Sequence, residues 1–366
     1  MKKIQMVDLQ IQYKYLKKDI FKRWKKLCSS SSFILGEEVC KFEEEFARYC
    51  NRKYAIGVSS GTSAIHLALV ALNAKDRHVI STPLTFIATN EAIIHAGAKI
   101  KWVDVDPHQY VIDPDAVASK VSQGDIILPV HLYGHMADME IICAVAKEHN
   151  LKIVEDCAQA HGAEFAGRKA GSAGDIGCFS FYPGKNLGAY GDAGAVVCDD
   201  SQLAEMMKRL RTHGSTDKYY HTEIGYNYRL DALQAAVLRI KLKYLDEWNQ
   251  ARREKAALYN ECLADLPVVL PKVHKKALHV YHQYVILASE RDKLKEKLSD
   301  DGISTAVHYP VPLNLQPAFK YMGCAEGSFP KAEQTAKECL SLPMCPELKT
   351  SQIQYISDKI REFYAG

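Results

Sequence analysis

The sequence lacks the features that mark membrane, secreted or nucleic-acid-binding proteins. No apolar run approaches the length of a membrane span, and the opening MKKIQMVDLQIQYKYLKKDI has no apolar signal-peptide core. The 11 cysteines include no C-x-x-C pair, which argues against a secreted disulfide framework. A net charge of +3 without a long basic run gives nucleic-acid binding no support. We therefore expect a reduced, cytoplasmic protein with neither nucleic acid nor membrane among its partners.

Several common binding motifs are also missing. No G-x-G-x-x-G follows a predicted strand, and PGKN lacks the spacing of a phosphate-binding P-loop. His131 and His135 in HLYGH could form a metal pair, but Gly134 lies between them and no H-E-x-x-H is present. Loop histidines are the better interpretation, and we expect no metal.

The chain is long enough for more than one core, since 47% of its 366 residues are hydrophobic. From about residue 54 to 200, short apolar runs alternate with helical patterns. This alternation predicts an α/β fold with a mostly parallel sheet covered by helices. The predicted strands are 54–58, 78–81, 99–105, 125–130, 152–156, 177–181 and 195–199, and the predicted helices between them are 62–73, 86–97 and 138–150.

The remaining chain predicts a second, smaller domain. A helix is expected within about the first thirty residues, and a long helical pattern from 230 to 263 links the two parts. We place the large domain at 1–245 and the linking helix with the small α/β domain at 246–366. The predicted elements of the small domain are a strand at 280–287, a helix at 290–302, a strand leading into a proline-rich loop at 303–317, and helices near 331–340 and 351–364.

One isolated lysine raises the question of function. Lys185 lies in FSFYPGKNLGAYGDAGAVV, among small, aromatic and glycine residues. Burial disfavours the ammonium form, so such a lysine becomes a usable amine nucleophile for a carbonyl. A turn lysine after a strand would look the same, and this stretch alone does not decide between the two.

Polar residues at other predicted strand ends extend the pattern. SSGTSA (59–64) opens a helix, where free amides favour a phosphate, although an ordinary N-cap uses the same residues. Asp156 ends a strand and could cap a loop or hold a proton on a ring nitrogen. Ser180 precedes the lysine, and GYNYRLD brings Asn227 and Arg229. Together they suit pyridoxal 5'-phosphate, which has a phosphate, a ring nitrogen and an aldehyde.

The sequence also resembles the DegT/DnrJ/EryC1/StrS family of pyridoxal-phosphate-dependent sugar aminotransferases. The resemblance covers nearly the whole chain and implies the fold-type-I aminotransferase architecture, with a seven-stranded sheet. The motifs that match are FILGEEVCKFEEEFARYC, GVSSGTSAIHLAL, PVHLYG, VEDCAQAHGA, GCFSFYPGKNLGAYGDAGA, GYNYRLDALQAAVL and HYPVPLNLQPAF. Ser63, where family members often have an acidic residue, and Cys157 are small departures.

The resemblance implies roles at matching positions. Lys185 would bond to the cofactor aldehyde, Asp156 would pair with its ring nitrogen, and Gln159 would lie near its hydroxyl. Asn227 would reach the cofactor of a neighbouring subunit, so that a homodimer would share its sites. The remaining implied cofactor residues are Gly61, Thr62, Ser63, Ser180 and Phe86, and the implied substrate residues are Tyr182, Arg229, His308 and Tyr309.

The activity implied is transamination of a nucleotide-linked keto-sugar with L-glutamate as amino donor. The lysine stretch resembles the branch of the family that aminates C3 of a dTDP-linked 3-keto-6-deoxyhexose. Members that aminate C4 more often have histidine in place of Tyr182 and a bulkier residue in place of Gly184. The alternatives are a 4-keto-sugar aminotransferase, a sugar dehydratase, which the retained Lys185 disfavours, and a non-catalytic regulatory protein.

Overall fold

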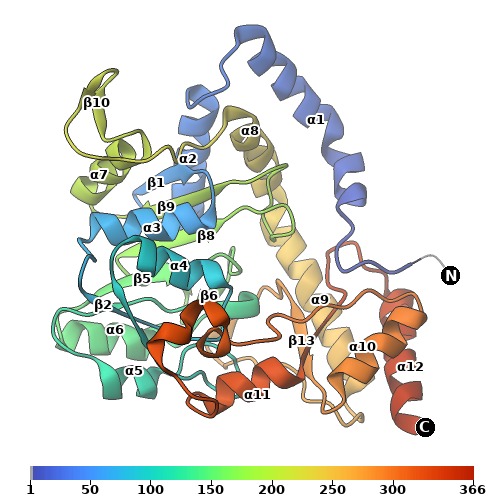
Figure 1. The fold of residues 1–366 in the computed structure, drawn as a ribbon. Helices are drawn as coiled ribbons and strands as arrows, with labels where there is room; N and C mark the ends of the chain where they lie inside the picture. Colours follow the sequence, from blue (N-terminus) through green and yellow to red (C-terminus); the bar gives the residue numbers. More distant parts are fainter. Residues whose placement is uncertain (1–2) are drawn as a thin grey trace.

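The seven strands predicted for the first half form one sheet (Figure 1). The computed structural model describes residues 3–366. β9 is antiparallel to both of its neighbours, and every other pair is parallel. The predicted mostly parallel, seven-stranded sheet is therefore confirmed. Its spatial order is β1 (Tyr54–Val58), β9 (Gly194–Cys198), β8 (Ile176–Ser180), β5 (Lys152–Asp156), β4 (Ile126–Ile127), β2 (His78–Ser81) and β3 (Lys99–Trp102).

Helices cover the sheet, and most residues of its central strands β8, β5 and β4 are buried, as expected of a parallel sheet between helical layers. α3 (Gly61–Ala71) packs across β5, β8 and β9 and contacts α4 (Ile87–His95) and α7 (Ser201–Arg211). α2 (Glu37–Tyr49) packs on β1 and on α8 (Ala232–Lys241). α5 (Pro114–Lys120), α6 (Met139–Glu148) and α1 (Leu9–Ser30) complete this part, and no helix within residues 3–366 combines the length and apolarity needed to cross a membrane.

A second core lies between elements near the end of the chain (Figure 1). α9 (Leu245–Leu263) and α12 (Thr350–Ala365) pack together beside the antiparallel pair β13 (Tyr284–Leu287) and β14 (Cys339–Leu342). Ile4 joins this core, so the N-terminal segment packs against the C-terminal elements. The division of the chain at 245/246 stays a prediction. α10 (Arg291–Asp300) and α11 (Pro330–Glu338) are the other helices here.

The structure corrects several predicted elements. The helix expected over 230–263 is broken by a 3₁₀ turn, Leu242–Tyr244. The strand expected from residue 303 is absent from the described chain, where Ile303 and Ala306 make only isolated bridges. The two bridges go to different segments, at Ile4 and Ser341, so no single partner strand builds a ladder here. The short strands β6 (Glu164–Phe165), β7 (Arg168–Lys169), β10 (Ser215–Asp217), β11 (Tyr220–His221) and β12 (Ala277–Leu278) were not predicted.

Candidate active site

A cavity of about 620 Å³ opens at the carboxyl ends of the parallel strands. Residues that follow β1, β2, β4, β5 and β8 line it on one side, and residues from the C-terminal elements close the other. Functional side chains collect at this edge because every parallel strand ends there. The predicted residues that line the cavity are Gly61, Thr62, Phe86, Asp156, Gln159, Ser180, Tyr182, Lys185, His308 and Tyr309.

Lys185 lies in the loop after β8 with its amine in the cavity wall. Burial lowers the pKa of Lys185 to about 8, and the carboxylate of Asp156 opposes part of that shift. The loop is held from behind, since Lys241 Nζ donates to the Gly188 carbonyl at 2.7 Å and Gln234 accepts from the Tyr190 amide at 2.8 Å. The loop that carries Lys185 is therefore anchored, and the amine is partly neutral near physiological pH, as a nucleophile for an aldehyde requires.

Asp156 ends β5 and presents its carboxylate to the same cavity. It accepts hydrogen bonds from Thr89 Oγ1 at 2.8 Å and from the Ala158 amide at 3.0 Å. Burial raises the pKa of Asp156, and these two donors lower it only in part. A cationic ring nitrogen beside this carboxylate would stabilise its charged form.

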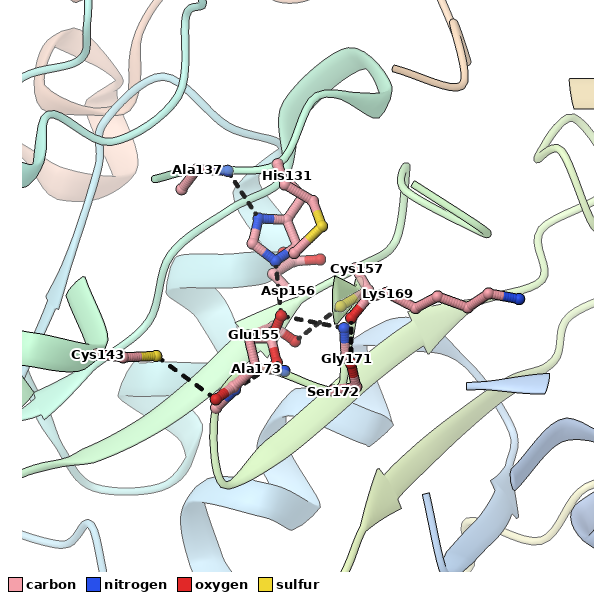
Figure 2. A network of polar contacts seen from close by, with 12 residues as sticks. His131, Ala137, Cys143, Glu155, Asp156, Cys157, Lys169, Gly171, Ser172 and Ala173 are labelled. Atoms are coloured by element: carbon pink, nitrogen blue, oxygen red, sulfur yellow. Dashed lines mark hydrogen bonds and ion pairs between the residues drawn. The ribbon is translucent and has the colours of Figure 1, made fainter. Parts of the chain in front are cut away.

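A second buried carboxylate, that of Glu155, belongs to the residue before Asp156 in β5 (Figure 2). Glu155 accepts hydrogen bonds from the amides of Gly171, Ala173 and Gly174 at 2.7–3.0 Å and from His131 Nε2 at 2.9 Å. Burial alone would raise the pKa of Glu155, but His131 and the backbone donors bring it below its usual value.

The Glu155 cluster is structural. His131, Glu155 and Cys157 lie close enough to suggest a metal site. However, His131 Nδ1 accepts from the Ala137 amide at 3.2 Å, so Nε2 holds the proton and donates to Glu155. His131 Nδ1 and both carboxylate oxygens of Glu155 therefore already accept hydrogen bonds within the protein, which leaves them poorly suited to bind a metal ion. The cluster ties β5 to the loop that follows β7.

Residues at the N-terminus of α3 line the cavity. Ser60 caps the helix by accepting from the Ser63 amide at 3.1 Å, and Ser63 Oγ completes a capping box. A Cβ on Gly61 would come within 2.6 Å of Ser180 Cβ, so only glycine lets β8 approach so closely here. Thr62 and Ser180 line the cavity, whereas Ser63 is buried in the cap and does not.

Hydrogen bonds between polar residues connect the two sides of the cavity. Gln159 Oε1 accepts from the Tyr133 amide at 2.6 Å, and its Nε2 donates to Tyr309 Oη at 3.3 Å. Tyr133 Oη in turn donates to the His308 carbonyl. The rings of Phe86 and Tyr309 lie 5.7 Å apart. Side chains distant in the sequence are thus brought together across the cavity.

Asn227 and Arg229 do not reach the cavity of their own chain. Asn227 is exposed and pairs through its backbone with Thr212, and Arg229 pairs with Val58. Neither lines the cavity of the described chain.

Several cavity residues escaped the sequence analysis. Thr89 donates a hydrogen bond to Asp156. The only sequence signal for this role is that Thr89 lies in the first turn of the helix that follows PLTF. His282 lines the cavity, and Tyr133 donates from its backbone amide to the cavity residue Gln159. The two lie in segments interpreted as a strand and a loop, where nothing local separates a site residue from a core residue. Met6 and Val7 line the cavity because the N-terminal segment packs beside β14.

A sequence profile of the DegT/DnrJ/EryC1/StrS aminotransferase family matches residues 14–361. The chain belongs to this family. It is 48% identical to the pleiotropic regulatory protein of Geobacillus stearothermophilus, over 99% of this chain and 98% of that one. It is 42% identical to the dTDP-3-amino-3,4,6-trideoxy-alpha-D-glucose transaminase of Streptomyces venezuelae, over 99% and 96%. The crystal structure of S. venezuelae DesV in complex with a ketimine intermediate matches it with a TM-score of 0.97 at 42% identity, over 99% of each chain.

Members of this family are pyridoxal-phosphate-dependent aminotransferases, so the predicted fold class, enzyme class and cofactor are confirmed. The residues present fit that cofactor. The buried carboxylate of Asp156, the amine of Lys185 and the glycine-lined N-terminus of α3 match its ring nitrogen, aldehyde and phosphate. When bound, pyridoxal phosphate supplies a reactive aldehyde and an electron-withdrawing ring.

Proposed function

We propose that this enzyme transfers the amino group of L-glutamate to C3 of a dTDP-linked 3-keto-6-deoxyhexose. The supporting observation is the cavity itself, a space of about 620 Å³ in which Lys185 and Asp156 lie together with polar side chains such as Gln159. The Streptomyces venezuelae relative, whose name specifies a dTDP-3-amino sugar, supports both the nucleotide and the carbon.

The assigned residue roles belong to this proposal. Lys185 acts as nucleophile and proton carrier, and Asp156 keeps the ring nitrogen charged. Thr62, Ser180 and the α3 amides bind the phosphate, Phe86 stacks on the ring, and Gln159 lies near its hydroxyl. Tyr182, His308 and Tyr309 contact the sugar, because they line the same cavity beyond Lys185.

The proposal includes a homodimer with shared sites. Asn227 is exposed and lies outside its own cavity, as expected of a residue that serves a partner subunit, and Arg229 lies two residues further on. A cytoplasmic location is also proposed, consistent with eleven free cysteines in the described chain.

A panel of nucleotide-linked sugars tests the proposal. Purified enzyme with L-glutamate is offered dTDP-linked and UDP-linked 3-keto and 4-keto sugars, and the product is analysed by NMR. We expect nitrogen on C3 and the highest kcat/KM with a dTDP-linked 3-keto sugar. Nitrogen on C4 would overturn the regiochemistry and leave the aminotransferase class intact. The Lys185→Ala variant, which lacks the nucleophile, serves as the inactive control.

A regulatory role is the second candidate, favoured by the name of the 48% identical relative. This chain has retained Lys185 and Asp156, which a protein that only keeps the fold would not need. L-Glutamate alone should convert the bound cofactor to its amino form, with a change in its visible spectrum. A protein without turnover would show no such change.

A further inference from the structure

His282 lines the active-site cavity and lies outside the roles assigned above. It immediately precedes β13, in the C-terminal part of the chain, and it is only partly buried. Its ring is joined to the lysine loop, since His282 Nδ1 lies 3.2 Å from Oδ1 of Asn186, the residue after Lys185.

A chain of hydrogen bonds determines which nitrogen of His282 holds the proton. The Asn249 amide donates to the His161 carbonyl at 2.8 Å, so Asn249 Oδ1 must be an acceptor. Asn186 Nδ2 donates to that oxygen at 2.8 Å and to the Val280 carbonyl at 3.1 Å. Two main-chain carbonyls, which only accept, therefore orient both amides. Asn186 Oδ1 is left as an acceptor, and His282 Nδ1 must be the donor.

The other ring nitrogen of His282 is free. In a neutral imidazole with the proton on Nδ1, Nε2 has a lone pair and can only accept. Within residues 3–366, Nε2 makes no hydrogen bond and is not among the buried polar atoms without a partner, so it is accessible from the cavity. Burial, followed by the charge of Lys185, lowers the pKa of His282 well below its usual value, so the ring stays neutral.

We propose that His282 is a specificity-determining residue whose Nε2 accepts a hydrogen bond from a hydroxyl group of the sugar beside the reacting carbon. The proposal rests on the proposed function and deepens it. Lys185 marks the position of the reacting carbon, and the Asn186 link holds His282 to the same loop, so the partner of Nε2 belongs to the sugar ring rather than to the nucleotide.

The keto-sugar and L-glutamate differ in whether they offer a hydrogen-bond donor to Nε2. A sugar hydroxyl is a donor and suits Nε2. The carboxylates of L-glutamate are acceptors, and a neutral lone pair beside them gives no attraction. The only donor of L-glutamate is its amino group, which is the group that reacts. His282 therefore contributes to binding of the keto-sugar and not to binding of the amino donor.

Three variants distinguish the contribution of each ring nitrogen. His282→Gln retains an amide oxygen near the position of Nε2, His282→Asn retains only a group near Nδ1, and His282→Phe retains neither. Steady-state kinetics with the keto-sugar and single-turnover spectra with L-glutamate are compared with wild type. For Asn and Phe we expect kcat/KM for the sugar to fall about tenfold to a hundredfold, as for a lost hydrogen bond in a closed site. Gln should recover part of the loss. In the Asn variant, which retains a donor near Nδ1 for Asn186, the L-glutamate half-reaction should be unchanged.

Each other outcome overturns the inference. An equal loss in both half-reactions would show that His282 acts on Lys185 or its loop, and unchanged sugar kinetics would show that Nε2 has no substrate partner. Nitrogen-15 NMR of the histidine-labelled holoenzyme, assigned with the Gln variant, tests the tautomer independently, and a proton on Nε2 would contradict it. A wild-type enzyme inactive with every keto-sugar would instead refute the proposed function, and this inference with it.

Discussion

At the scale of single residues, Lys185 and Asp156 have opposite pKa shifts with one cause. Removal from water disfavours charge, so burial lowers the pKa of the amine and raises the pKa of the carboxyl. Each moves the other back toward its charged form. The pair is therefore prepared for a ligand that reacts with the amine and brings a positive charge to the carboxylate.

The Lys185 shift predicts a pH-dependent stability of the apoprotein. The folded pKa is about 8 and the ordinary value is 10.5, so between them the unfolded chain binds more protons, and the free energy of unfolding rises with pH. Lys185→Met removes the free-energy cost of burying a charged amine. We expect it to stabilise the apoprotein at neutral pH by about 1 kcal/mol, a figure reduced because part of the side chain faces the cavity.

Urea titrations at several pH values measure this effect. The advantage of the methionine variant should be largest below the folded pKa and should disappear above the ordinary lysine pKa. A difference that does not depend on pH would mean that side-chain packing, rather than the charge, explains the change.

Asp156→Asn tests the role of the carboxylate. The amide oxygen can still accept from the Ala158 amide, and the amide nitrogen can donate to the Thr89 hydroxyl, which is able to accept, so the fold should survive. The asparagine cannot keep a ring nitrogen protonated. We expect the cofactor to remain bound while kcat falls by several orders of magnitude. Stopped-flow absorbance of the L-glutamate half-reaction measures this directly. A fall of only a few-fold would identify Asp156 as a structural cap.

At the scale of elements, the Glu155 cluster stabilises the strand that presents Asp156. Three amides of one loop and a histidine from another segment converge on a single buried carboxylate (Figure 2). Each donor would be costly to leave unpaired in the interior. The position of Asp156 therefore depends on the residue before it, whose side chain lies outside the cavity lining.

Glu155→Gln should destabilise the protein strongly. The new amide places a donor against backbone donors, and we expect a loss of about 3 kcal/mol in the free energy of unfolding. Glu148→Gln, at an exposed position on α6, is the matched control and should change it by less than about 0.5 kcal/mol. Urea denaturation at neutral pH compares the two.

The pH dependence of the same variant has a definite sign. The pKa of Glu155 lies below its usual value of 4.5, so its stabilisation is complete above that value and is lost as the pH falls through the lower, folded pKa. The difference between wild type and Glu155→Gln should therefore shrink on acidification. A constant difference would contradict a charged carboxylate in the fold.

At the scale of the whole molecule, the cavity is assembled from distant parts of the chain. The sheet supplies Lys185 and Asp156, the C-terminal elements supply His308, and the N-terminal segment supplies Met6. A site that closes only when these parts pack together depends on the complete fold.

Subunit mixing tests the proposed shared sites. Lys185→Ala and Asn227→Ala chains are each expected to be inactive or severely impaired. In a mixed dimer one site would contain both changes and the other neither, so an equal mixture should recover roughly a quarter of the wild-type sites. Activity after co-refolding, with mixed dimers verified by differently tagged chains, gives the answer. No recovery would show that Asn227 serves the site of its own subunit.

Much of the large sheet could be predicted from the sequence because its signals are local. Strands such as 54–58 and 152–156 are short apolar runs bounded by turn residues, and a parallel order follows from the intervening helices. Lys185 and Asp156 could be found because both follow strands whose carboxyl ends meet at one edge. The structure of the region around 303–317 could not be predicted, because its bridges depend on Ile4 and Ser341, which are far away in the sequence.

The sequence by itself determined the family and the cofactor and singled out Lys185 as the candidate nucleophile, because these depend on residue types at short, ordered spacings. Only the tertiary structure decided that Ser63 belongs to a helix cap, that Glu155 supports Asp156, and that the proton of His282 lies on Nδ1. The reason is physical: the partner of a hydrogen bond and the water around a side chain are set by segments that meet only in the folded chain. Local sequence places a residue at the end of a strand, and packing determines what that residue can donate, accept or react with.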